Sequence, residues 1–243
     1  MRGIWRQKLF SEDLDFAGGV EFKASDLMSM KGCLEAYLGN RYGLIVSVKE
    51  PKEMTDDPTH HAIKVDKWQL NVITSPERKD MPQQKIKIEV INVPAYSRVP
   101  QALLHNYDFL PDGYSDLLVM VETIEEIMAD KLISLVNCSR YIRNRDIWDL
   151  RWLKQEGARI NTQFIRAKIS DYQIINYLEK LDSFLEHVVE IVHGKIFMDE
   201  MSRFIPSDVQ ARTLRQEKFL TFLCNEITQM FEAVRRSLLD GGI

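Results

Sequence analysis

The sequence predicts an α+β protein in which a mixed β-sheet comes first and a bundle of helices follows. Segments between residues 44 and 121 alternate apolar and polar residues with the period of two that is typical of strands. From Thr123 onward Gly and Pro become scarce, and apolar residues recur at helical spacing. We therefore expect two domains, a sheet domain over residues 1–122 and a helical domain over residues 123–243.

The first expected strand contains Phe10-Ser11-Glu12-Asp13-Leu14-Asp15-Phe16. Residues two apart in a strand point to one face, so Asp13 and Asp15 are expected side by side. Leu14 and Phe16 are then expected in the core. Two neighbouring carboxylates suit Mg²⁺, which prefers oxygen ligands and also binds substrate phosphates. Considered alone, however, the pair fits a solvated strand end better.

A helix is expected next, because leucines and a methionine recur at helical spacing from Leu27 to Leu38. Ser25 or Asp26 can cap this helix, and Gly39-Asn40 marks its end. Beyond it, β-branched and alternating segments predict a partly antiparallel sheet, with strands over residues 44–48, 62–73, 85–93 and 117–121.

The helical half begins at Thr123-Ile124-Glu125-Glu126, which has the form of a capping box for a helix that reaches about Val136. The Thr hydroxyl and the Glu carboxylate of such a box accept hydrogen bonds from the first free amides. Further helices are expected over residues 144–155, 172–191 and 210–239, with interruptions near Gly194 and Pro206.

Composition and charge exclude several classes of protein. A chain of 243 residues that is 45% apolar can bury a proper core, and its net charge of −4 argues against a generally basic nucleic-acid binder. Cys33, Cys138 and Cys224 fit neither a disulfide framework nor a zinc site, which indicates a reducing compartment. Without a signal peptide or a membrane-spanning run, the protein is expected in the cytoplasm and not in a membrane.

A third carboxylate, Glu89, lies in an otherwise apolar strand and shares a face with Lys85 and Lys87. A solvent-facing surface of Lys and Glu explains this pattern. Beside Asp13 and Asp15, Glu89 would instead complete a two-metal site, in which one metal activates the attacking hydroxyl and the other holds pyrophosphate.

Two further candidates lie in the helical half. Lys131, in Ala129-Asp130-Lys131-Leu132, is close to the apolar face of its helix, so its ammonium needs a partner. It is either a surface lysine or a lysine that holds the triphosphate. Asp146 and Asp149, in Arg145-Asp146-Ile147-Trp148-Asp149-Leu150, share one helix face, although Asp146 could simply cap the helix.

Residues 140–168 contain eight basic and three acidic residues, a local excess of positive charge on an acidic protein. This segment could receive an RNA backbone or the triphosphate, with Tyr141, Trp148 and Trp152 available for stacking. An ordinary helix surface has the same composition. The basic residues are Arg140, Arg143, Arg145, Arg151, Lys154, Arg159, Arg166 and Lys168.

Taken together, the segments 10–16, 87–89, 125–132 and 145–150 resemble the AbiEii/AbiGii toxin family of nucleotidyltransferases, within the polymerase-β-like superfamily. The order and spacing of these motifs agree with the family over residues 8–153, and only helical character is shared beyond about residue 155. The resemblance implies a nucleotidyltransferase domain followed by a helical domain. It also implies Mg²⁺-dependent transfer of a nucleotide from a nucleoside triphosphate to a hydroxyl acceptor, which is tRNA in some members.

The resemblance further implies an antitoxin partner, a role in phage defence or growth arrest, and a set of site residues. Glu89 rests on the strand argument more than on the family pattern. The expected catalytic residues are Asp13, Asp15, Lys131 and Asp146, the expected nucleotide-binding residues are Ser11, Lys131 and Arg145, and the expected metal ligands are Asp13, Asp15 and Glu89.

Family members carry a Gly-Gly-Thr or Gly-Ser turn ten or more residues before the paired aspartates, and amides at such a turn bind phosphate. Only Arg2-Gly3-Ile4-Trp5 precede the strand here, so we expect this turn to be missing. A start codon assigned too far downstream or a shortened homologue with weakened nucleotide binding would explain this. The alternative function is a catalytically impaired homologue that binds RNA or a protein. A helical module without a ligand is favoured only if Lys131 and Asp146 lie far from Asp13.

Overall fold

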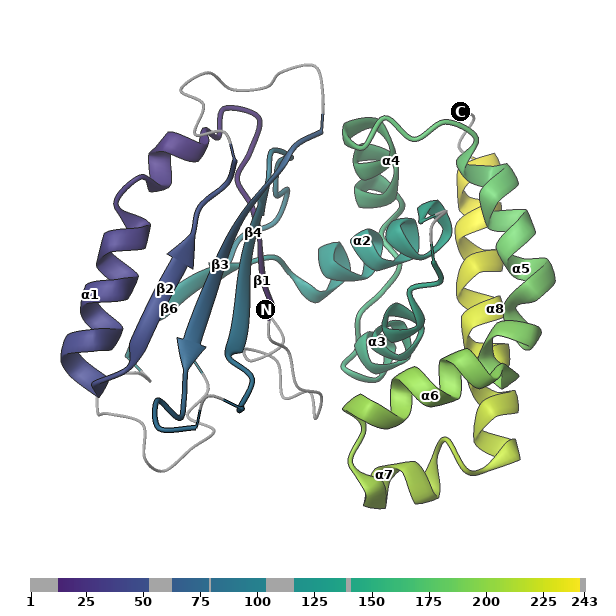
Figure 1. Cartoon of the computed structure of the whole chain (residues 1–243). Helices are drawn as coiled ribbons and strands as arrows, with labels where there is room; N and C mark the ends of the chain where they lie inside the picture. Colours follow the sequence, from purple (N-terminus) through teal and green to yellow (C-terminus); the bar gives the residue numbers. More distant parts are fainter. Residues whose placement is uncertain (1–12, 53–62, 79, 104–115, 139–140, 241–243) are drawn as a thin grey trace. The chain divides into compact units, whose positions relative to one another are not determined.

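The computed structural model describes residues 13–52, 63–78, 80–103, 116–138 and 141–240. The chain divides into two compact units, of which the first ends at Ala95 and the second begins at Tyr96. This division precedes the boundary expected at residues 122–123, so the segment that follows Ala95 groups with the helices. Figure 1 shows the elements of each unit, coloured along the sequence.

The first unit contains a sheet of four strands, β1 (Asp13–Ala17), β2 (Ile45–Lys49), β3 (Val65–Ile73) and β4 (Gln84–Ile91). The strand order is β1-β4-β3-β2. β1 runs parallel to β4, and β3 runs antiparallel to both β4 and β2. The mixed sheet predicted from the sequence is thus confirmed.

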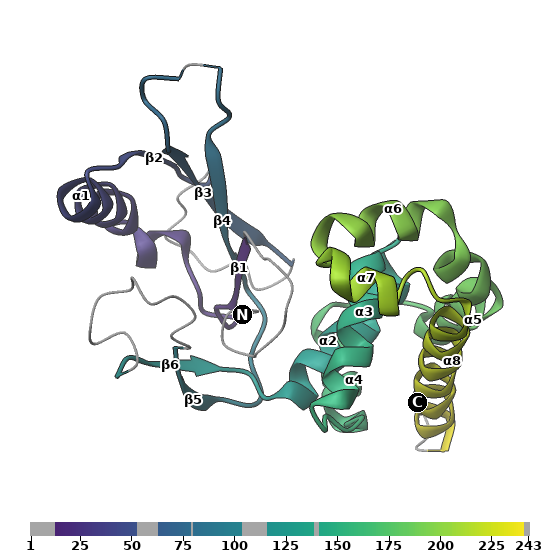
Figure 2. The same ribbon diagram turned by 90° about the horizontal axis from the view of Figure 1, so that it is seen from below.

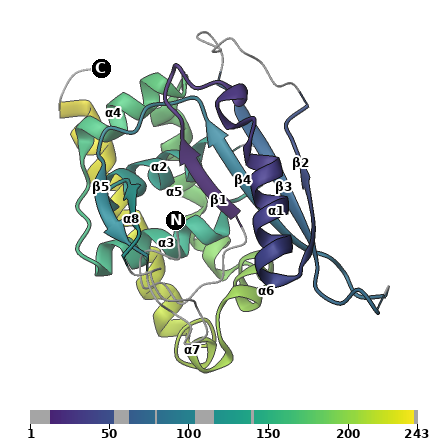
Figure 3. The same ribbon diagram turned by 90° about the vertical axis from the view of Figure 1, so that its left-hand side faces the viewer.

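One face of this sheet is covered by helix α1 (Met30–Tyr42), which follows a short 3₁₀ helix, η1 (Ala24–Leu27) (Figure 3). Leu34 and Leu38 of α1 pack against a buried cluster that includes Trp68, which confirms the apolar helix face. The helix continues beyond the end expected at Gly39-Asn40. It ends before Gly43, whose φ of 65° lies in the left-handed region that glycine adopts without strain.

The apolar side chains of β1 are less buried than expected. Leu14 and Phe16 lie beside Ile88 and Val90 of β4, so they are on the apolar face of the sheet as predicted. Each of them is nevertheless 43% exposed. The reason is that β1 is an edge strand of the four-stranded sheet, and α1 contacts β2 at the opposite edge. The expectation that both side chains enter the core was therefore wrong.

The second unit begins with a two-stranded antiparallel sheet of β5 (Val99–Ala102) and β6 (Leu118–Val121). The strand β6 was expected, whereas β5 was missed because it is short and contains Pro100.

Seven helices follow in the described part of the second unit, and Figure 2 shows them from a second direction. Buried side chains of this unit form one continuous core. The helices are α2 (Ile124–Asn137), α3 (Asn144–Gln155), α4 (Thr162–Asp171), α5 (Tyr177–His193), α6 (Lys195–Phe204), α7 (Ser207–Arg212) and α8 (Glu217–Asp240). Among the described residues, no helix has the length and apolar character needed to cross a membrane.

The bounds of α2 and α3 agree with those predicted from the sequence. The predicted interruptions are also found, because one helix ends and the next begins at Gly194 and near Pro206. The helix expected over residues 172–191 starts later, because Gln173 and Asn176 have positive φ angles of 50° and 60° and separate α4 from α5. The helix expected over residues 210–239 is likewise divided into α7 and α8.

Candidate active site

Three carboxylates of the first unit lie on one face of its sheet. The parallel register places Asp15 directly beside Glu89, and Asp13 beside Lys87. Since paired residues of adjacent strands point to the same face about 4.8 Å apart, Asp13, Asp15 and Glu89 are neighbours on the face opposite the Trp68 cluster. The strand pairing thus gives Glu89 the position that the alternation of residues suggested.

Lysines accompany these carboxylates. Lys67 Nζ lies 2.8 Å from Glu89 Oε1, and Lys87 Nζ lies 3.5 Å from Asp13 Oδ2. In the described part of the chain, no three His, Cys, Asp or Glu side chains are gathered as they would be around a metal ion. The oxygen donors nevertheless suit Mg²⁺. The lysines would have to turn aside, and breaking exposed ion pairs of this kind costs only about 0–1 kcal/mol each.

In the second unit, Lys131 of α2 lies between two aspartates of α3. Its Nζ is 2.7 Å from Asp146 Oδ1 and 2.8 Å from Asp149 Oδ2. Both carboxylates are almost fully buried, whereas the Lys131 side chain is 21% exposed. The predicted need of Lys131 for a partner and the shared face of Asp146 and Asp149 are therefore confirmed.

Asp146 is held by two further groups. Arg143 Nε lies 2.7 Å from its Oδ2, and the Ser134 hydroxyl donates to the same oxygen over 2.8 Å. Burial alone would raise the pKa of Asp146, but the charges of Lys131 and Arg143 outweigh burial and lower this pKa, so the carboxylate stays ionised. The cap of α3 is Arg143, without a side-chain cap hydrogen bond, so the capping role considered for Asp146 is not observed.

The residues expected to bind the nucleotide or to stack on a base differ in their exposure to solvent. The Arg145 guanidinium lies over the Phe204 ring, 4.1 Å from its centroid. Trp148 is only 7% exposed and packs against Phe219, so it is not available for stacking on a base. Tyr141, in contrast, is exposed. Ser11 lies outside the described residues.

Most of the basic side chains in residues 140–168 contact other groups of the same chain. Lys154 pairs with Glu226 over 2.8 Å, and Arg166 donates to the carbonyl oxygens of Ser237 and Leu238 near the end of α8. Arg151 lies over the Phe219 ring. Arg159 remains at the surface, and Arg140 lies outside the described residues.

Lys168, expected within a basic surface segment, is instead 1% exposed at the centre of an acidic cluster. Its Nζ lies 2.9 Å from Glu126, 3.2 Å from Asp130 and 3.5 Å from Glu122. Sequence reasoning missed this cluster. A usable signal was present, because Lys168 follows the buried Ile165 by three residues and so lies on the apolar face of α4.

Glu126 also explains where the two compact units divide. The Thr123 hydroxyl accepts from the Glu126 amide, as in a capping box. The Glu126 carboxylate does not complete the box but accepts from the amides of Tyr96 (2.9 Å) and Ser97 (2.6 Å). These bonds attach the start of the second unit to α2, which places the division before Tyr96.

Glu122→Gln is expected to remove a pH dependence of stability. Burial, reinforced by the charge of Asp130, raises the pKa of Glu122 to about 7. In the unfolded chain the pKa of a Glu carboxyl is about 4.3, which is lower than its pKa in the folded protein. The protonated Glu122 carboxyl therefore contributes its full stabilisation below about pH 4.3, and this stabilisation is lost as the pH rises through 7. Between about pH 5 and pH 8, the wild type should lose on the order of 1–2 kcal/mol relative to the variant.

Urea denaturation followed by circular dichroism at several pH values measures this difference. Glu190→Gln, at an exposed position of α5, is the matched control and should track the wild type. A difference between Glu122→Gln and wild type that is constant with pH would contradict the prediction.

Both units thus carry charged groups of the kind that metal-assisted phosphoryl transfer uses. The family model described as Nucleotidyl transferase AbiEii toxin, Type IV TA system, matches residues 8–233, and so extends well past residue 153, where the agreement of the sequence motifs ends. The chain belongs to this family of nucleotidyl transferase toxins of type IV toxin–antitoxin systems. Membership implies an enzyme with a nucleoside triphosphate substrate and an antitoxin partner. Comparisons with the curated proteins and with the solved structures found no match.

Proposed function

We propose that this chain transfers a nucleoside monophosphate from a nucleoside triphosphate to a hydroxyl of tRNA, in the cytoplasm, as the toxin of a phage-defence system. The observation that carries the proposal is the shared sheet face of Asp13, Asp15 and Glu89. Carboxylates on adjacent strands are held by the sheet, and rigid positioning supplies much of the catalysis in phosphoryl transfer.

Asp13, Asp15 and Glu89 would hold Mg²⁺, which supplies charge neutralisation at the reacting phosphates and lowers the pKa of the attacking hydroxyl. Lys131 would contact a phosphate through the part of its side chain that reaches solvent. Asp146 and Asp149 fix the position of the Lys131 ammonium. Lys131 donates a hydrogen bond of 2.7 Å to Asp146 and lies 2.8 Å from the carboxylate of Asp149.

One observation favours the alternative, an impaired homologue that binds RNA or a protein. The pairs Lys67–Glu89 and Lys87–Asp13 are the arrangement of an ordinary charged sheet surface. Titration with a nucleoside triphosphate in the presence and absence of Mg²⁺ separates the two functions. A transferase binds more tightly with the metal, whereas a surface of paired charges does not.

Asp13→Ala is expected to lower nucleotide transfer at least about 100-fold, because it removes a metal ligand. The measurement is the labelling of total tRNA by each labelled nucleoside triphosphate with Mg²⁺. Asp80→Ala is the control, since Asp80 is an exposed carboxylate of the same unit that pairs with Arg78. The proposal fails if wild type labels no RNA, or if Asp13→Ala and Asp80→Ala label equally well.

A further inference from the structure

Arg143 lies at the start of α3 and pairs with the same carboxylate as Lys131. Arg143 Nε is 2.7 Å from Asp146 Oδ2, and Lys131 Nζ is 2.7 Å from Asp146 Oδ1. Since the two oxygens belong to one carboxylate, the two cations are held side by side. Two packed helices fix this arrangement, because Arg143 and Asp146 are three residues apart at the start of α3 and Lys131 belongs to α2.

The positive groups of this cluster reach the solvent, whereas its negative groups are buried. The side chains of Arg143 and Lys131 are 43% and 21% exposed. Those of Asp146 and Asp149 are only 3% and 2% exposed. An anion that approaches from the solvent therefore meets the two cations first. The buried carboxylates hold both cations in place, which reduces the entropy that is lost when an anion binds.

The ion pair with Asp146 engages one nitrogen of the Arg143 guanidinium, Nε. The two terminal nitrogens, Nη1 and Nη2, donate no hydrogen bond to the part of the chain that the structure describes. A guanidinium that is anchored through Nε still presents the edge with these two nitrogens. This planar edge can form two parallel hydrogen bonds with a phosphate.

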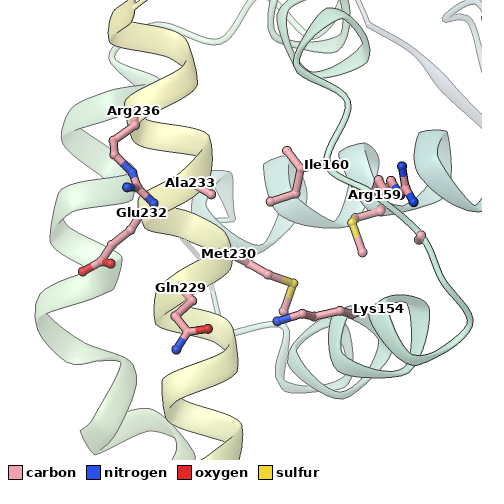
Figure 4. Close-up of a pocket in the computed structure, with 10 residues that line it drawn as sticks. Lys154, Arg159, Ile160, Gln229, Met230, Glu232, Ala233 and Arg236 are labelled. Carbon is pink, nitrogen blue, oxygen red and sulfur yellow. The ribbon is translucent and has the colours of Figure 1, made fainter.

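Another group of basic side chains in this unit lacks such an arrangement. Lys154, Arg159 and Arg236 line a pocket between α8 and the connection from α3 to α4 (Figure 4). Arg236, however, lies on the side of α8 that is away from Arg159. Lys154 pairs with Glu226 over 2.8 Å. That pocket therefore does not present two adjacent cations to one ligand.

The chemistry of Arg143 and Lys131 indicates a chain of phosphates as the ligand. The guanidinium can bind one phosphate through two hydrogen bonds, and the ammonium beside it is a point charge for a second phosphate. The phosphates of a nucleoside triphosphate are directly linked, and their charge must be neutralised during transfer. In RNA a ribose separates successive phosphates, so the triphosphate fits the closely held pair of cations better.

We propose that Arg143 is a second phosphate-binding residue of the transferase, with its guanidinium on one phosphate of the nucleoside triphosphate and Lys131 on the next. The inference rests on the proposed function in one respect, that Lys131 contacts the triphosphate. It assigns the role expected for Arg145 to Arg143, because the Arg145 guanidinium lies over the Phe204 ring.

The test is the affinity of Arg143→Gln for inorganic triphosphate with Mg²⁺, measured by isothermal titration calorimetry on the full chain. This probe carries no base, so the result does not depend on which nucleotide is transferred. We expect binding to weaken about 10- to 100-fold, because hydrogen bonds between charged groups are lost. The matched control is Arg235→Gln. Arg235 Nε lies 2.6 Å from Asp182 and its side chain is 44% exposed, so this variant should change binding less than about 2-fold.

Arg143→Lys separates phosphate binding from the support of Asp146. A lysine keeps a positive charge beside the buried carboxylate, so circular dichroism and thermal melting should show a folded protein. It cannot form the two parallel hydrogen bonds of a guanidinium, so we expect binding at least about 3-fold weaker than in wild type. Wild-type affinity in Arg143→Lys or Arg143→Gln would overturn the proposal, as would a wild type that binds no triphosphate.

Chemical modification of the wild type tests the contact without any variant. Phenylglyoxal reacts with the terminal nitrogens of accessible arginines, and mass spectrometry of peptides measures the reaction at each residue. With inorganic triphosphate at about ten times its Kd, the modification of Arg143 should slow about 10-fold, whereas that of Arg235 should not change. Equal modification of Arg143 with and without triphosphate would refute the contact.

Binding of inorganic triphosphate is measured separately from transfer, so the two functions can fail independently. A wild type that binds the probe through Arg143 but transfers no nucleotide would refute the transferase activity alone. Transfer by Arg143→Gln with an unchanged KM for the nucleoside triphosphate would refute the Arg143 contact alone. If Arg143→Gln weakens only the binding of a short single-stranded RNA, the arginine contacts RNA and the proposal fails.

Discussion

Lys168→Met is expected to lower the free energy of unfolding of the helical unit by about 3–5 kcal/mol, the usual effect of removing one partner of a buried ion pair. Burial alone would lower the pKa of Lys168, but the carboxylates of Asp130, Glu122 and Glu126 outweigh burial and raise it, so the ammonium is charged. The variant leaves Glu126, which is fully buried, without its cation. Urea denaturation followed by circular dichroism measures the loss.

Lys154→Met is the matched control for this prediction. The Lys154–Glu226 pair has a similar distance of 2.8 Å, but the Lys154 side chain is 40% exposed, so we expect a loss below about 1 kcal/mol. Adding Glu126→Gln to Lys168→Met should restore part of the stability, because it removes one uncompensated charge. Equal stability of Lys168→Met and Lys154→Met would show that the acidic cluster does not need its lysine.

Lys131→Met is expected to lower nucleotide transfer about 100- to 1,000-fold, the effect of losing one positioned donor to the reacting phosphates. Lys131→Arg should not restore activity. The two aspartates lie 2.7 and 2.8 Å from Nζ and hold a compact ammonium, whereas a guanidinium is planar and larger. Steady-state kinetics of transfer to tRNA measure both variants.

Lys180→Met is the control for Lys131→Met. Lys180 also lies in the helical unit and donates to the Asn137 side chain, so its loss should change activity less than about 3-fold. Circular dichroism should show both variants folded. Transfer by Lys131→Met at more than a tenth of the wild-type rate would mean that Lys131 does not act on the phosphates.

Local spacing in the sequence is enough to predict the arrangement around Lys131. A helix fixes which residues share a face, so the spacing of three residues between Asp146 and Asp149 already places their carboxylates together. The bounds of α3 follow from the sequence in the same way. The neighbouring carboxylates of Asp13 and Asp15 follow from the alternation of a strand, which is equally local.

Contacts between distant segments cannot be predicted in this way. The charge of Lys168 predicts a position on the surface. Only the packing of α4 against α2 shows that three carboxylates surround its ammonium. Leu14 and Phe16 were expected in the core, because alternation gives their face of the sheet but not the coverage of that face.

The mixed sheet, the helical second half, the candidate acids and the family of the chain could all be predicted from the sequence alone. Each of these depends on residues that are close in sequence or on their order. The position of Glu89 beside Asp15 and the burial of Lys168 became clear only from the folded structure. Strand register and helix packing depend on the apolar surface buried over the whole unit. A short segment of sequence does not carry this information.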